Sequence, residues 1–269
     1  MRNGIYTFLL GILLLTSCSQ YNNLLKTSDV ECKYEAAKAY YLSGEYDKAT
    51  PLLEGLVSML KGNRNGEESL YMLAMCYYES GDYDTASQYF KTYYSNYQRG
   101  VYAEHARFHC GKSLYKNIPE PELDQSSTYK AIQELQLFVE YYPTSRYKQE
   151  TQEMLFAMYD ILVEKDYLSA QLYYNLGSFD KMRNNYQACI VTAENALKDY
   201  PYTKLREDLT ILILRAKFQM AKNSVEDKKV DRYRDAIDEY YAFKNEFPES
   251  KYLEEAEKYY KESLKEVNE

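Results

Sequence analysis

Apolar residues recur along most of the chain at the three- and four-residue spacing of amphipathic helices. The clearest pattern is a pair of helical segments separated by a short turn that contains glycine, an acidic residue and tyrosine. It occurs twice, as Gly44-Glu45-Tyr46 and as Gly81-Asp82-Tyr83. Glycine is typical of a helix end and an acidic residue of the next helix start, so the pattern predicts two successive helical hairpins.

The two turns begin 37 residues apart, close to the roughly 34-residue period of tetratricopeptide (TPR) repeats. The second hairpin also matches the residue spacing of that family, and the first matches part of it: Leu70, Leu73, Ala74, Tyr77, Ala86 and Phe90; Ala37, Tyr40, Ala49 and Leu53. The chain thus resembles TPR proteins, which predicts an all-α solenoid of five repeats and a C-terminal capping helix. The small signature residues of the second helices are predicted to be Ala49, Ala86, Ala131, Ala188 and Ala236.

Later segments depart from the regular repeat length. The third hairpin begins near residue 101, contains Gly111 where two helices approach closely, and carries a proline-rich acidic insert at 117–126. The string Tyr142-Pro143-Thr144-Ser145-Arg146-Tyr147 recurs at 247–252 and indicates a joint between repeats, where proline ends one helix and Ser or Thr begins the next. The predicted elements after the first joint are a long helix at 146–176, a helix at 185–199, helices at 204–222 and 233–246 around a charged insert at 223–232, and a last helix at 252–267.

The N-terminus has the pattern of an exported lipoprotein. Arg2 precedes an apolar run at 5–15, which is too short to span a bilayer and is followed by Leu15-Thr16-Ser17-Cys18. This string resembles a bacterial lipobox, so we expect a signal peptide at 1–17, lipidation of Cys18 and a tether at 18–30, with N-terminal repeats at 31–143 and C-terminal repeats at 144–269. An ordinary signal peptide near a cysteine is the alternative. Ser19 in place of an acidic residue favours the outer membrane.

Composition narrows the class of partner. The net charge is −8 and the chain has no basic stripe, which counts against nucleic acid as the main partner. The chain has 33 tyrosines and no tryptophan, so tyrosine is expected at helix contacts. Cys76, Cys110 and Cys189 lie in helical segments and are predicted to be buried thiols, whereas Cys32 has no evident role.

Catalytic motifs are scarce. His105 and His109 are one helical turn apart, a spacing that suits a metal ion, but the glutamate of a metalloprotease motif is missing. The chain contains no G-x-S-x-G, P-loop or G-x-G-x-x-G sequence. We therefore expect a protein that is not an enzyme and that holds no metal or cofactor.

In TPR proteins the first helices of successive repeats line a concave groove. The corresponding stripe here is mostly aromatic, with lysines in the first and third repeats: Tyr34, Lys38, Tyr41, Tyr71, Met75, Tyr78, Phe108, Lys112 and Tyr115. Such a surface suits an extended peptide with an apolar or aromatic C-terminus, whose carboxylate would meet a lysine. The alternative is that these tyrosines pack against neighbouring helices.

The lipobox, tether and five repeats together resemble the BamD family, the lipoproteins of the outer-membrane β-barrel assembly machine. The run YMLAMCYYESGDY at 71–83 is similar to the second repeat of that family, and the joints and the third-repeat insert are similar too. The resemblance implies a scaffold on the periplasmic face of the outer membrane. It also implies that C-terminal repeats dock the barrel-forming subunit, with other assembly lipoproteins as further partners, and that N-terminal repeats receive the C-terminal signals of unfolded outer-membrane proteins.

Two other classes stay open. One is a different TPR adaptor lipoprotein, acting in envelope coordination or nutrient uptake; the absence of tryptophan counts against sugar-stacking sites. The other is a hydrolase with an unrecognised site.

Overall fold

The computed structural model describes residues 21–62, 64–177 and 185–268, and over these residues the chain forms helices and turns without any β-strand. This confirms the all-α prediction. The helices are α2 (Val30–Leu42), α3 (Tyr46–Met59), α4 (Arg64–Glu79), α5 (Tyr83–Asn96), α6 (Ala103–Lys116), α7 (Ser126–Tyr141), α8 (Lys148–Leu176), α9 (Asn185–Asp199), α10 (Arg206–Lys222), α11 (Glu226–Glu246) and α12 (Leu253–Asn268). The predicted signal peptide and Cys18 lie outside the described residues.

The chain divides into two compact units. Unit 1 contains the described residues up to 119 together with 126–155, and unit 2 contains 120–125 and the described residues from 156 onward. The helix α8 therefore contributes its first turns to unit 1 and the rest to unit 2.

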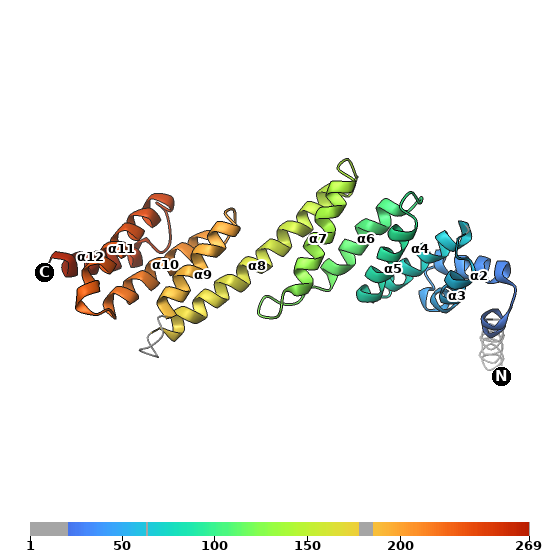
Figure 1. The fold of residues 1–269 in the computed structure, drawn as a ribbon, viewed down its shortest axis with the longest axis horizontal. Coiled ribbons are helices and arrows are strands. Elements are labelled where there is room, and N and C mark those ends of the chain that lie inside the picture. The colour runs from blue at the N-terminus through green and yellow to red at the C-terminus, as the bar shows by residue number, and fades with distance from the viewer. Residues whose placement is uncertain (1–20, 63, 178–184, 269) are drawn as a thin grey trace, which may run out of the picture. The chain divides into compact units, whose positions relative to one another are not determined.

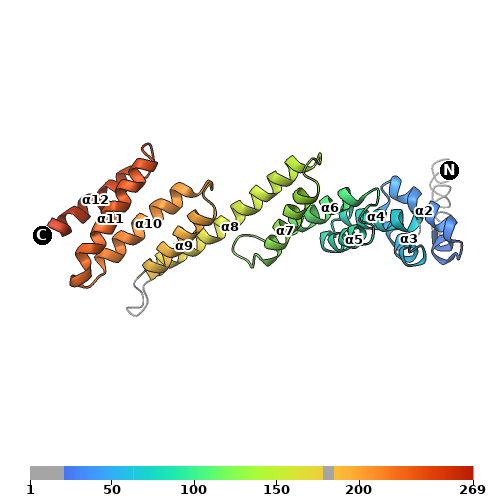
Figure 2. The ribbon, with the colours of Figure 1, turned by 45° about the horizontal axis from the view of Figure 1, so that its top comes forward.

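Unit 1 consists of three helical hairpins, α2/α3, α4/α5 and α6/α7, in which each helix packs against the next (Figures 1 and 2). The first two hairpins turn in the same way. Gly44 and Gly81 have φ of 76° and 83°, a left-handed conformation that glycine adopts without strain. Backbone N–H groups just after each helix donate back into its last turn, from Glu45 to the Tyr40 carbonyl at 2.9 Å and from Asp82 to the Tyr77 carbonyl at 3.0 Å. This pairing satisfies the carbonyl groups that a helix end leaves without partners.

The second helix of every repeat buries the same pattern of side chains. A small residue, the residue four positions later and the residue seven positions later are all at most 3% exposed: Ala49, Leu53, Leu56; Ala86, Phe90, Tyr93; Ala131, Leu135, Phe138; Cys189, Ala193, Ala196; Ala236, Tyr240, Phe243. The prediction of Ala188 as the signature residue of the fourth repeat is wrong, because Ala188 is half-buried and Cys189 takes its place. Ala188 and Cys189 are adjacent and similar in size. Which of them faces the core depends on how the helix is rotated about its axis.

The structure confirms two local predictions, the buried thiols and the close helix approach at Gly111. Cys76, Cys110 and Cys189 are free and buried, and Cys32 is free and exposed. A Cβ atom added at Gly111 would lie 2.3 Å from Leu135 Cδ2, so only glycine allows α6 and α7 to pack at this distance.

The predicted tether is partly ordered against the first hairpin. Residues 21–26 are helical, and the Tyr21 hydroxyl donates to the Lys48 carbonyl at 3.0 Å. Tyr21 and Leu24 both pack against the core of the first hairpin, because their spacing of three places them on one side of a helix. Asp29 then caps α2, its side chain accepting from the Cys32 N–H at 3.0 Å.

Unit 2 packs α8 from residue 156 onward, α9 and α10 around one core and α10, α11 and α12 around two others. The insert at 117–126 ends in a loop in which Gln125 is buried and donates to the Glu120 carbonyl at 2.7 Å. The Lys165 ammonium of α8 donates to the Leu123 carbonyl at 3.0 Å, which ties this loop to the helix.

The prediction of a charged insert outside the helices at 223–232 is wrong, because α11 begins at Glu226. Glu226 and Asp227 lie in its first turn, where negative charge interacts favourably with the helix dipole. Lys229 pairs with Glu266 of α12 at 3.3 Å. The segment contains no helix breaker, but its only apolar residues are Val225 and Val230, too few to show a helical period.

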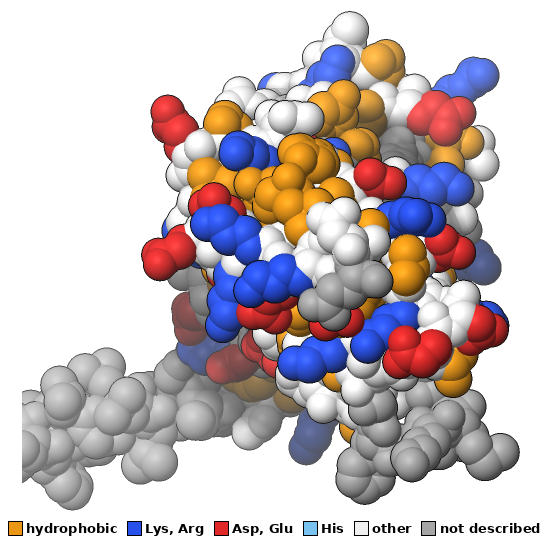
Figure 3. All heavy atoms as spheres, turned by 90° about the vertical axis from the view of Figure 1, so that its left-hand side faces the viewer, with side chains coloured by type: hydrophobic (Ala, Val, Ile, Leu, Met, Phe, Trp, Pro, Cys, Tyr) orange, Lys and Arg blue, Asp and Glu red, His pale blue; other side chains and the backbone are white. Residues whose placement is uncertain are grey.

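Figure 3 looks onto the end of unit 2 that carries α11 and α12. Apolar side chains gather near the middle of this face and charged side chains surround them. Tyr241 of α11 is 45% exposed, and its hydroxyl lies 2.7 Å from the hydroxyl of Tyr260 of α12. The capping helix therefore leaves some aromatic surface in contact with solvent.

Candidate binding cleft

A cleft of about 720 Å³ lies in unit 1 where three segments meet. Its lining comes from Tyr71 on α4, from residues 101–105 at the start of α6, and from residues 141–147 between α7 and α8. We term residues 142–147 joint 1. Most of the large side chains that line the cleft are aromatic: Tyr71, Tyr102, His105, Tyr141, Tyr142 and Tyr147.

Tyr71 is held in place by a ring stack and a hydroxyl contact. Its ring stacks on Tyr102 with centroids 4.1 Å apart, and its hydroxyl is 2.7 Å from His105 Nδ1. Only 8% of the residue is exposed, and burial raises the pKa of its hydroxyl. Tyr71 therefore stays neutral and contributes a rigid ring edge and a polar group to the cleft.

His105 and His109 stack on each other, with centroids 4.2 Å apart. Burial lowers the pKa of His105, and burial followed by the neighbouring His105 lowers the pKa of His109 to about 3. Both imidazoles are consequently neutral near pH 7. Across the described parts of the chain, no group of three or more His, Cys, Asp or Glu side chains is placed to hold a metal ion.

Joint 1 places an arginine at the edge of the cleft. Tyr147 stacks on Phe108 with centroids 4.2 Å apart, and the guanidinium carbon of Arg146 lies 4.7 Å from the centre of the Tyr147 ring. Arg146 also donates to the Tyr147 hydroxyl oxygen. Among the residues that the structure describes, Arg146 has no carboxylate partner and the Tyr147 hydroxyl has no acceptor. The cleft thus offers a cation that has no ion-pair partner beside a hydroxyl donor. The one carboxylate in its lining, Glu104, accepts from Ser145 Oγ at 2.6 Å.

The two lysines of the predicted groove are already paired. Lys38 Nζ is 2.9 Å from Glu68, which also accepts from the Tyr34 hydroxyl at 2.6 Å. Lys112 Nζ is 2.7 Å from Glu150. A ligand carboxylate would have to displace a glutamate at either lysine, whereas Arg146 requires no such exchange.

Burial separates the nine predicted groove residues into two sets. Four are at most 9% exposed, and the other five are half-buried: Tyr34, Tyr71, Met75 and Phe108; Lys38, Tyr41, Tyr78, Lys112 and Tyr115. The cleft includes Tyr71 directly and Phe108 through its stack with Tyr147. Their role in binding stays a prediction, and the buried members offer little area to a peptide.

Several cleft residues were not predicted from the sequence. Tyr102, Tyr141 and the joint residues Arg146 and Tyr147 lie outside the groove stripe, at or next to the ends of helices. The repeated joint string could have indicated them, but it was interpreted only as a connection between repeats. Its arginine and its aromatic residues are side chains that could bind a ligand.

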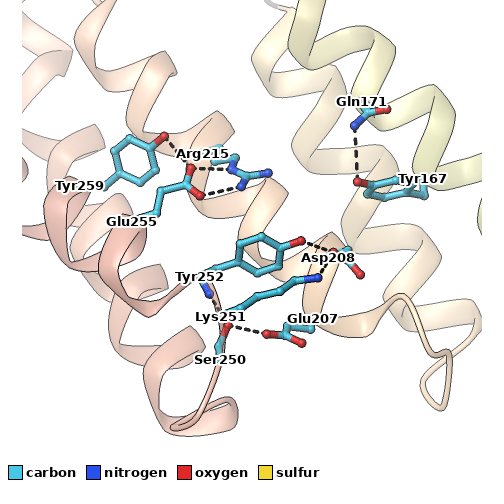
Figure 4. Close-up of polar contacts among 10 residues, drawn as sticks. All are labelled: Tyr167, Gln171, Glu207, Asp208, Arg215, Ser250, Lys251, Tyr252, Glu255 and Tyr259. Carbon is cyan, nitrogen blue, oxygen red and sulfur yellow. Dashed lines mark hydrogen bonds and ion pairs between the residues drawn. The ribbon is translucent and has the colours of Figure 1, made fainter.

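Unit 2 contains the same joint at residues 247–252, termed joint 2, and Figure 4 shows its contacts. The backbone N–H of Tyr252 donates to Ser250 Oγ at 2.9 Å, as Tyr147 N–H does to Ser145 Oγ at 3.0 Å. Ser250 bonds to Glu207 as Ser145 bonds to Glu104. The Tyr252 hydroxyl then donates to Asp208 at 2.6 Å, a residue whose counterpart in unit 1 is His105.

A second polar cluster of unit 2 lies between α10 and α12 (Figure 4). Arg215 donates to both carboxylate oxygens of Glu255, at 2.7 and 2.6 Å, and the Tyr259 hydroxyl donates to the same carboxylate at 2.9 Å. The Arg215 hydrogen bonds lower the pKa of Glu255. Two-point pairing of this kind fixes one helix against the other.

The repeated hairpins, joints and helix register define a helical repeat protein of the TPR class. A model of an outer membrane lipoprotein family, YfiO, matches residues 27–229. The chain therefore belongs to the YfiO family of outer membrane lipoproteins, which confirms the resemblance to BamD. Within the described residues, no helix is long and apolar enough to cross a membrane.

Other comparisons are distant. Two crystal structures of a Podosopora anserina putative kinesin light chain with nearly identical TPR-like repeats, one of them a single-residue variant, align with 82% of this chain and 97% of theirs. Their sequence identity is 13% and their TM-scores are 0.38 for the variant and 0.37 for the other. A search of curated proteins found no significant match.

Proposed function

We propose that this protein is a non-catalytic scaffold of the outer-membrane β-barrel assembly machinery, held on the periplasmic face of the outer membrane by a lipid on Cys18. In this proposal the C-terminal repeats dock the barrel-forming subunit, other assembly lipoproteins join the complex, and unit 1 binds the C-terminal segments of unfolded outer-membrane proteins. Membership of the YfiO family of outer membrane lipoproteins supports the lipid anchor and the outer-membrane location in this proposal.

The observation that carries the peptide-binding part is the cleft at joint 1. It combines rigid tyrosine rings with one unpaired arginine. An aromatic C-terminal residue brings together an apolar ring and a carboxylate, and these two groups match the two features of the cleft. Tyrosine rings give contact area at low entropic cost, because few torsions are fixed on binding.

Affinity isolation tests the scaffold. The lipid-anchored chain, tagged at its C-terminus, is solubilised from envelopes in mild detergent and its partners are identified. We expect a barrel protein with periplasmic repeat domains in near-stoichiometric yield. Recovery of transporters or cell-wall enzymes in its place would exclude the assembly role and favour another TPR adaptor lipoprotein.

Crosslinking tests the cleft. A photoreactive residue in place of Tyr102, whose ring lines the cleft, should capture unfolded outer-membrane proteins. The matched control carries the same residue in place of Tyr202, which is 97% exposed in unit 2. Equal capture at both positions would show non-specific contact and contradict binding in the cleft.

A further inference from the structure

The two joints have one local structure but different partners on the facing helix. In both, a serine side chain accepts from the backbone N–H two residues later and bonds to a glutamate of the preceding first helix, Glu104 of α6 or Glu207 of α10. The next residue on that helix is His105 in unit 1 and Asp208 in unit 2. The joints can therefore be compared residue by residue.

Joint 2 contains its own carboxylate. Asp208 Oδ1 accepts from the Tyr252 hydroxyl at 2.6 Å and lies 3.9 Å from Lys251 Nζ. One carboxylate oxygen thus faces both a tyrosine hydroxyl and a cation, as Figure 4 shows. The hydroxyl and the lysine of joint 2 both have an intramolecular partner.

Joint 1 keeps the two donors and lacks the acceptor. Arg146 and Tyr147 correspond to Lys251 and Tyr252, but His105 Nδ1 is committed to the Tyr71 hydroxyl at 2.7 Å. Its lowered pKa keeps it uncharged at neutral pH. Within the described residues no carboxylate bridges Arg146 and Tyr147, and the cleft beside them measures about 720 Å³.

We propose that joint 1 is a carboxylate-binding subsite, in which the terminal carboxylate of a bound peptide takes the place that Asp208 occupies in joint 2. Arg146 pairs with the carboxylate and the Tyr147 hydroxyl donates to it, while the aromatic lining of the cleft receives the terminal side chain. This inference rests on the proposed function of unit 1, since it names the chemical group that the cleft recognises. It assigns recognition of the peptide carboxylate to Arg146, in place of Lys38 and Lys112.

Joint 2 supplies the template for a carboxylate ligand. There the hydroxyl and the cation of adjacent residues both face one carboxylate oxygen, Asp208 Oδ1. Because the subsite is partly exposed, the pairing adds a modest amount to affinity, and the preference for a free carboxylate over an amide measures that amount.

Fluorescence anisotropy tests the proposal with the detergent-solubilised, lipid-anchored full chain. The probes are a short labelled peptide ending in phenylalanine with a free carboxylate, and the same peptide with an amidated C-terminus. We expect the free acid to bind about tenfold more tightly than the amide. Arg146→Gln should weaken the acid about tenfold and leave the amide unchanged, which abolishes the discrimination.

Two variants complete the test. Lys148→Gln removes the same charge from an exposed position two residues away, outside the cleft lining, and should preserve the discrimination. His105→Asp supplies the missing acceptor and should also abolish the preference for the free acid. Circular dichroism and thermal melts establish that each variant is folded.

The outcomes separate the two levels of the proposal. Binding of acid and amide with equal affinity, unaffected by Arg146→Gln, would overturn the carboxylate subsite and leave the peptide cleft intact. Absence of binding by either peptide would overturn the proposed function of unit 1 itself. An equal loss with Lys148→Gln and Arg146→Gln would show general electrostatic attraction and would also overturn the subsite.

Discussion

The contact between α6 and α7 allows a sharp test of how the repeats pack. A Cβ atom at Gly111 would lie 2.3 Å from Leu135 Cδ2 and 2.7 Å from Leu135 Cγ, whereas ordinary contacts begin at 3.4 Å. Leu135 is fully buried, so the side chain or the helix must move by about 1 Å, and overpacking of this kind costs about 1–3 kcal/mol.

Gly55 provides the matched control. It also lies inside a helix, α3, but a Cβ atom there would meet nothing within 4 Å. Replacing a helical glycine by alanine stabilises by about 0.5–1 kcal/mol through backbone entropy, and this gain is common to both sites. The difference between Gly111→Ala and Gly55→Ala therefore isolates the steric cost.

Urea denaturation followed by circular dichroism measures both variants. We expect Gly55→Ala to be more stable than the parent protein and Gly111→Ala to be less stable than Gly55→Ala by about 1–3 kcal/mol. Adding Leu135→Ala to Gly111→Ala should cost less than in the parent, because the smaller side chain removes the overlap. Equal stabilisation by the two glycine replacements would refute the reasoning.

Three further predictions concern the register, a buried histidine and the thiols. Cys189→Leu should destabilise the protein by about 1–3 kcal/mol by overpacking, whereas Ala188→Leu should be nearly neutral; the reverse order in urea denaturation would restore Ala188 as the core residue. Unfolded His109 takes up a proton near pH 6.5 and folded His109 only at about pH 3, so the free energy of unfolding should fall as the pH drops through this window, and His109→Gln should flatten the fall. A thiol reagent should modify Cys32 in the native protein and spare the three buried thiols, whose pKa burial raises to about 12; rapid reaction of a second thiol among these four would contradict the packing.

Local features of the fold were predictable because they depend on residues close together in the chain. The turn glycines at 44 and 81 require a backbone conformation that few other residues adopt. The small residue of the second helix follows from helix periodicity in four repeats, whereas in the fourth Cys189 takes the place expected for Ala188. The joints follow from proline and serine. Where this reasoning failed, at 223–232, valines 225 and 230 are the only apolar residues, too few to show a helical period.

The state of the groove was not predictable, because it depends on residues from the next repeat. Lys38 is neutralised by Glu68, which lies 30 positions later, and Lys112 by Glu150, which lies 38 positions later. Tyr71 is buried by Tyr102, and Phe108 by Tyr147 of the following joint. A stripe identified within each repeat therefore shows which side of the helix faces the groove, but not which side chains remain open to a ligand.

The joints show how a repeat protein can differ in function between repeats that share a local structure. Each joint has the same hydrogen bond from a backbone N–H to the serine side chain and presents a cation followed by a tyrosine, so these features cannot by themselves distinguish the two units. The distinguishing residue lies on the first helix of the same repeat, α6 or α10, about forty positions earlier, where the chain has His105 or Asp208. The Asp208 carboxylate accepts the hydrogen bond of the joint tyrosine within the chain. His105 is neutral and bonded to Tyr71, so the donors of joint 1 stay available to an acceptor from a ligand. Binding capacity in this chain is thus expected where the facing helix fails to supply the acceptor, a criterion that depends on contacts between repeats and not on the repeat signature.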